Sequence, residues 1–178
     1  ALEASKVMEI TLTGKTCGLE ERAPMCGVPY HAVDTYINKL VTRGYKVCIV
    51  EQVEDPALAK GLVKRDVSRI VTPGTNLNLA SMEEGKNNYL MSIAYIGGKF
   101  GISIADVTTG DYYVTEVYTE RNVVDEINKF MPSEIICNHS FLMCGMDIDD
   151  IKNRLSISVF ELEEWYFDED NCAEVLKD

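Results

Sequence analysis

The chain has 178 residues, of which 46% are hydrophobic and 26% charged, and its formal net charge is −12 at pH 7. This balance is typical of one large or two small globular domains and excludes a wholly disordered chain. No apolar run approaches the length of a membrane span, and no secretory signal opens the chain. Because the chain starts without Met inside an apparent helix, we expect an excised part of a longer protein.

The charge is unevenly distributed. Residues 1–75 carry ten Lys/Arg and nine Asp/Glu, whereas residues 76–178 carry seven and twenty. The second part is therefore a poor ligand for polyanions, because its field repels phosphates. This asymmetry predicts two units with different roles.

The first part alternates between helix and strand. Its clearest element is a helix over 30–43, because apolar residues recur with helical spacing from Val33 to Val41. Tyr45–Gln52 is nearly continuously apolar, which predicts a buried strand. The other expected elements are a helix over 1–8, a strand over 9–13, a loop over 14–29, a helical turn at 55–56 and a strand over 64–72.

Residues 75–86 lack periodicity and are predicted to be a linker. Three strands at hairpin spacing follow, over 88–96, 99–107 and 110–117. Further along we expect a helix over 119–131, a strand over 134–138, a helix over 149–155, a strand over 156–162 and a last helix over 168–178. This order predicts a mixed α/β fold in which helices pack on a mixed five-stranded sheet.

Six cysteines are present, and no two of them have the two-residue spacing of a zinc knuckle or a thioredoxin-like site. Without a secretory signal, we expect free thiols in a reducing cytoplasm. Cys48 lies in an apolar run and is predicted to be a small core residue.

Three stretches carry a specific resemblance: Ala23–His31, Glu51–Pro56 and Arg69–Thr75. In this order and spacing they resemble the N-terminal region of the MutS family of DNA mismatch-repair proteins. Residues 9–13 and 104–110 fit the same pattern.

The resemblance covers nearly the whole chain as two pieces. It implies that 1–75 are the later part of an α+β mismatch-recognition domain, that 76–86 are a linker, and that 87–178 are most of an RNase H-like connector domain. The family reads mismatches with a Phe-Xaa-Glu motif, which would belong upstream of Ala1, since the first Phe here is Phe100.

The family's partners and cofactors follow from the same resemblance. They are mismatched double-stranded DNA, the protein MutL, a second copy in a homodimer, and ATP with Mg²⁺. The complete Gly-Xaa-Xaa-Xaa-Xaa-Gly-Lys-Ser/Thr sequence of the family's phosphate-binding loop is absent from these residues, so we expect no cofactor and no catalytic site here. No membrane partner is expected.

Two groups of residues are candidates for DNA contact. In the turn from Met25 to His31, glycine and proline would let the backbone approach a phosphate, although a purely structural turn remains the alternative. The basic cluster Lys60, Lys64, Arg65 and Arg69 would bind phosphates or form a solvated surface, and Arg69 has a structural alternative. The predicted nucleic-acid-binding residues are Lys15, Met25, Gly27, Tyr30, His31, Lys60 and Arg65.

Two rival functions are considered. Asp106 would suit an RNase H-like, metal-dependent nuclease, but the first strand of the second part, 88–96, has no carboxylate where that fold places its first catalytic Asp. The other rival is a protein-interaction module, in which the connector surface would meet MutL. The acidic run 161–170 is expected to be a solvated surface, with a patch for a protein partner as the alternative.

Overall fold

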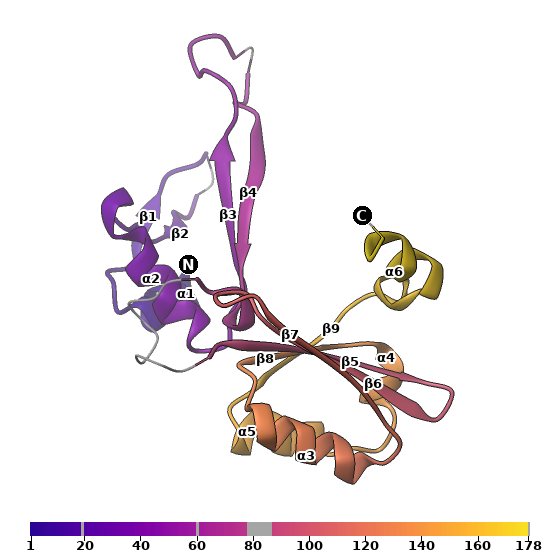
Figure 1. Cartoon of the computed structure of the whole chain (residues 1–178). Coiled ribbons are helices and arrows are strands. Elements are labelled where there is room, and N and C mark those ends of the chain that lie inside the picture. Colours follow the sequence, from indigo (N-terminus) through magenta and orange to yellow (C-terminus); the bar gives the residue numbers. More distant parts are fainter. Residues whose placement is uncertain (19, 60, 78–86, 178) are drawn as a thin grey trace. The chain divides into compact units, whose positions relative to one another are not determined.

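The computed structural model describes residues 1–18, 20–59, 61–77 and 87–177 (Figure 1). Its described residues divide into two compact units, 1–72 and 73–77 with 87–177. Most of the expected linker lies outside the described residues, so the boundary at residue 75 stays a prediction. None of the helices in the described ranges combines the length and apolarity that crossing a bilayer requires.

The first unit consists of short elements around a small core. In chain order they are α1 (Leu2–Met8), β1 (Thr13–Lys15), β2 (Ala23–Met25), the 3-10 helix η1 (Tyr30–Ala32), α2 (Val33–Val41), β3 (Val47–Gln52) and β4 (Arg65–Val71). The predicted helical stripe is confirmed, because Ile37 and Val41 of α2 are buried with Val71 of β4.

The prediction of a strand over 9–13 is wrong. Glu9 adopts a left-handed conformation with φ 57° and ends α1. The strand begins only at Thr13, where β1 pairs with β2 in an antiparallel hairpin. β-branched residues favour a strand in this segment. Because α1 ends only at Glu9, however, strand pairing begins later, within the hairpin.

The strand over 45–52 exists as β3, but its predicted burial is wrong. β3 pairs antiparallel with β4 in a two-stranded ribbon, so helix α2 covers one face at the base of this ribbon and leaves the other exposed. Val50 is 51% exposed, and Cys48 is exposed rather than a core residue. An apolar run is therefore not proof of burial on both faces.

The second unit contains the predicted mixed five-stranded sheet. Its strand order is β7-β6-β5-β8-β9. The first three strands form antiparallel pairs, and β8 pairs parallel with both β5 and β9. The strands are β5 (Tyr89–Ile96), β6 (Lys99–Asp106), β7 (Asp111–Val117), β8 (Glu134–Cys137) and β9 (Ser158–Glu161).

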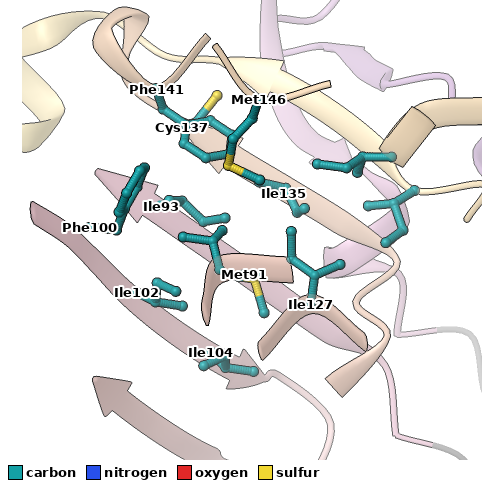
Figure 2. Packing of buried hydrophobic residues seen from close by; sticks show 13 residues of the cluster. Met91, Ile93, Phe100, Ile102, Ile104, Ile127, Ile135, Cys137, Phe141 and Met146 are labelled. Carbon is teal, nitrogen blue, oxygen red and sulfur yellow. The ribbon is translucent and has the colours of Figure 1, made fainter. Parts of the chain in front are cut away.

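Helices pack on one face of this sheet. They include α3 (Glu120–Phe130) and α5 (Ile148–Arg154), which contribute Ile127 and Ile151 to the core. The sheet contributes Met91, Ile93 and Ile135, among others, and Figure 2 shows these side chains interdigitating. This core is far larger than that of the first unit.

Four elements were not expected from the sequence. They are the strand β2, which lies within the loop expected over 14–29, the helix α4 (His139–Leu142), which places Phe141 in the core, the 3-10 helix η4 (Glu164–Phe167) and the 3-10 helix η2 (Pro73–Thr75). The predicted last helix is present as α6 (Glu169–Val175). The unexpected elements are only three or four residues long, too short for any periodic pattern to reveal.

Candidate nucleic-acid interface

The β1–β2 hairpin carries the first two predicted contact residues. Thr13 pairs with Met25 and Lys15 with Ala23, and the Thr13 hydroxyl donates a hydrogen bond to the Met25 carbonyl over 2.9 Å. The Arg22 guanidinium bonds the Gly14 carbonyl, which closes the hairpin. The side chains of Lys15 and Met25 are both exposed, so this hairpin presents a cation and a thioether to solvent.

The turn after β2 presents the next three predicted residues. Gly27 is exposed, and a Cβ added there would meet nothing within 4 Å. Packing therefore does not require glycine at this position. This favours the prediction that Gly27 lets the backbone approach a phosphate. Tyr30 is 89% exposed, and His31 is exposed beside it. The expected helix begins here only as the 3-10 turn η1, and the α-helix starts three residues later at Val33.

Arg65 lies on a different element, the β3–β4 ribbon. It is the first residue of β4 and pairs with Gln52 across the ribbon. Lys64 precedes it, and the exposed side chains of both residues have no ionic or hydrogen-bond partner in the part of the chain that the structure describes. Lys60 lies outside the described residues.

Arg69 differs from Arg65, although both lie on β4. Its guanidinium is 3.6 Å from the Asp34 carboxylate of α2, and this contact links the ribbon to the helix. The structural alternative therefore accounts for Arg69. Lys39 likewise has an ionic partner, because its ammonium lies 2.9 Å from the Glu9 carboxylate. This contact holds the pKa of that carboxyl below its usual value.

The basic residues of the first unit thus differ in whether their side chains have an ionic partner. Within the described ranges, Lys15, Lys64 and Arg65 have uncommitted cationic groups, whereas Arg69 and Lys39 do not. The site prediction omitted Lys64, because residue types alone cannot show which cations already have a carboxylate partner. Uncommitted, exposed cations are the groups that can neutralise phosphates.

Asp106, the residue of the nuclease alternative, has a structural role. It is 1% exposed, and its carboxylate accepts hydrogen bonds from the Asn88 backbone and from the backbone and hydroxyl of Thr108. Burial raises its pKa, but these hydrogen bonds outweigh burial and lower the pKa below its usual value. β5 carries no carboxylate, and no cluster of three or more metal-ligating side chains occurs among the described residues.

Several acids of the run 161–170 also make local contacts. Glu161 lies 2.9 Å from the His139 ring, and the Trp165 indole donates to Glu163 over 2.8 Å. Asp168 caps α6 by accepting from the Asn171 backbone. These contacts explain part of the acidic run without a ligand.

All six cysteines are free thiols in the structure. Burial raises the pKa of the Cys137 thiol to about 11, so it remains protonated and unreactive at neutral pH.

Comparisons with known proteins agree with this division into two units. The family model of MutS domain I matches residues 1–80, and that of MutS domain II matches residues 88–178. The DNA mismatch repair protein MutS of Lachnoclostridium phytofermentans is 60% identical over 178 residues, which are 100% of this chain and 19% of that protein.

Two other relatives give the same result. The DNA mismatch repair protein MutS of Ruminiclostridium cellulolyticum is 52% identical over 97% of this chain and 20% of its own length. That of Acetivibrio thermocellus is 53% identical over 94% of this chain and 20% of its own length. The chain belongs to the MutS family and comprises residues of its domains I and II. It spans about a fifth of the length of these curated relatives.

Proposed function

We propose that the whole protein binds mismatched double-stranded DNA to begin repair, and that this chain supplies phosphate contacts from its first unit. The observation that supports this most directly is the pair of uncommitted cations Lys64 and Arg65, on a ribbon of the region matched by MutS domain I. Lys15 adds a third such cation on the β1–β2 hairpin. The second unit acts as a connector.

The proposed contacts are electrostatic and independent of sequence. Phosphate contacts position a protein on DNA but do not read bases directly. Residues 76–178, with seven basic and twenty acidic side chains, oppose binding. We therefore expect this chain to bind duplex DNA no more tightly than the non-specific range of about 10⁻⁴ to 10⁻⁶ M.

The remaining parts of the proposal concern the whole protein. ATP with Mg²⁺ would act in a region other than the one described here, MutL would be the protein partner, and two copies would assemble in the cytoplasm. We propose that residues 1–178 bind DNA rather than catalyse a reaction.

The test compares two arginines of the same strand. We expect Arg65→Gln to weaken binding and to reduce the slope of log K against log salt by about 0.9, as loss of one phosphate contact requires. The matched control Arg69→Gln removes an arginine that is already paired with Asp34, so it should leave this slope unchanged.

Anisotropy titrations on a G·T duplex and on its matched homoduplex complete the experiment. Equal affinities are expected, because residues 1–75 contain no Phe and so no Phe-Xaa-Glu motif. A tenfold preference for G·T, about 1.4 kcal/mol, would contradict the proposal that these residues contact only phosphates. Equal effects of the two arginine substitutions would overturn the assignment of Arg65.

A further inference from the structure

The segment 73–77 lies within the residues matched by MutS domain I, but in the structure it belongs to the second unit. It contains the 3-10 helix η2, and only Thr72 separates this helix from the end of β4. The chain that leaves the first unit is therefore held by the second unit almost at once. We call this segment and the side chains that hold it, those of Asn88, Ser133 and Glu134, the clasp.

A buried carboxyl group holds the first part of the segment. Glu134 is the first residue of β8 and is 2% exposed, and its carboxylate accepts a hydrogen bond from the Gly74 backbone over 2.8 Å. Gly74 is also buried. A buried carboxyl group is costly unless it has hydrogen-bond partners, and the docked segment supplies one.

Asn88, which directly precedes β5, holds the segment at two further points. Its side-chain amide donates hydrogen bonds to the Pro73 carbonyl over 3.0 Å and to the Asn76 carbonyl over 3.4 Å. The Ser133 hydroxyl donates to the oxygen of the same amide over 2.6 Å, which fixes its orientation. The segment is therefore tied to the second unit near both of its ends.

We propose that the clasp is a conformational device that sets the length of chain between the two units. While it is closed, one residue separates β4 from η2, and a single residue spans at most about 4 Å. If it opens, at least residues 72–77 separate β4 from the second unit, and six extended residues span about 20 Å. The closed clasp thus restricts how far the two units can move independently, whether or not the chain binds DNA.

Hydrogen exchange in the 178-residue chain tests whether the clasp is closed. Glu134→Ala removes the acceptor of the Gly74 amide. We therefore expect this amide to exchange about tenfold to hundredfold faster, relative to the amides of β5 and β6, than in the wild type. Asn88→Ala removes the donors to two carbonyls of the segment and should act in the same direction. It also provides the test if Glu134→Ala does not fold.

Rotational correlation times from NMR relaxation test the consequence for the two units. Opening of the clasp lengthens the connection, so both variants should shorten the correlation time of the amides in β3 and β4. Ile127→Val is the matched control, because it weakens the core of the second unit without touching the clasp. It should change neither the relative exchange rate of Gly74 nor this correlation time.

Three results would overturn the inference. Rapid exchange of Gly74 in the wild type, with β5 protected, would show that the clasp is not closed. An unchanged correlation time in variants that release Gly74 would show that the clasp does not restrict the units. Equal effects of Ile127→Val and Glu134→Ala would show that general destabilisation is the cause. None of these results bears on DNA binding, which Arg65→Gln tests separately.

Discussion

At the scale of single residues, Gly74 shows why one short motif has its composition. Its backbone donates a hydrogen bond over 2.8 Å to Glu134, whose side chain is buried at 2% exposure. A Cβ at Gly74 would lie 3.0 Å from the Cβ of Leu90 and 3.1 Å from that of Glu134. Only a residue without a side chain lets η2 lie this close to the sheet.

We therefore expect Gly74→Ala to lower the free energy of unfolding of the second unit by about 1–3 kcal/mol, the usual effect of overpacking. Urea unfolding followed by circular dichroism measures this change. Gly27→Ala is the control, because open space surrounds Gly27, and it should change stability by less than about 0.5 kcal/mol. An unaltered urea midpoint for Gly74→Ala would contradict this prediction, because it would show that the sheet can shift to accommodate the added methyl group.

The buried carboxylate of Asp106 links protonation to stability. Its pKa in the folded chain is below the usual value of 3.8, because hydrogen bonds favour the charged form despite burial. The stability it contributes is therefore present above the pKa of the unfolded chain and is lost as pH falls through the lower, folded pKa. This effect is confined to acidic pH below about 4.

We expect Asp106→Asn to lower the free energy of unfolding at pH 7 by about 1–3 kcal/mol, because an amide cannot accept all of these hydrogen bonds. The variant should also lose stability less steeply between pH 5 and pH 2.5 than the wild type. Chemical denaturation across this pH range measures both effects, with Asp125→Asn on the exposed surface as control. Parallel pH profiles for wild type and Asp106→Asn would exclude this linkage.

At the scale of elements, helix α3 shows how local sequence and packing agree. The Thr119 hydroxyl accepts a hydrogen bond from the Asn122 backbone over 3.2 Å and caps the helix, while Val123 and Ile127 are buried on one face. Met131 ends the helix in a left-handed conformation just before Pro132.

Removing this cap should have a measurable effect. We expect Thr119→Ala to lower the free energy of unfolding by about 1 kcal/mol, because one backbone amide loses its acceptor. Thr119→Ser keeps the hydroxyl and should retain most of the stability. Equal melting temperatures for the alanine and serine variants would show that the cap contributes nothing.

At the scale of the whole molecule, the two units differ in the size of their cores. The buried cluster of the first unit consists of Ile37, Val41 and Val71, whereas that of the second unit has thirteen members, drawn from three strands and three helices and from the segments that join them. Apolar burial is the main favourable contribution to folding, so the units should differ in stability.

We predict that urea unfolds the first unit before the second. Hydrogen exchange should show greater protection in β5, β6 and β8 than in β3 and β4. Ile127→Ala should shift only the later transition, by about 2–5 kcal/mol, because Ile127 lies in the core of the second unit. A single cooperative transition shifted as a whole by this substitution would contradict independent units.

Much of this architecture follows from the sequence. Periodicity places the helix that contains Ile37 and the helix that contains Ile127, because one apolar stripe on each must be buried. Turn residues such as Gly97 and Gly98 separate strands at hairpin spacing, which predicts the antiparallel part of the sheet. The motifs around Gly27, Asp55 and Gly74 lead to the family, which the comparisons show independently.

Tertiary structure alone decided the remaining features, because they depend on partners distant in sequence. Burial of β3 depends on how many faces of its ribbon are covered, so Val47 lies toward the core while Cys48 faces solvent. Likewise, Arg65 and Arg69 are the same residue type on one strand, and only Asp34 on a helix some thirty residues earlier distinguishes them. Residue type determines which groups can carry charge, but the fold determines which of those charged groups already have a partner.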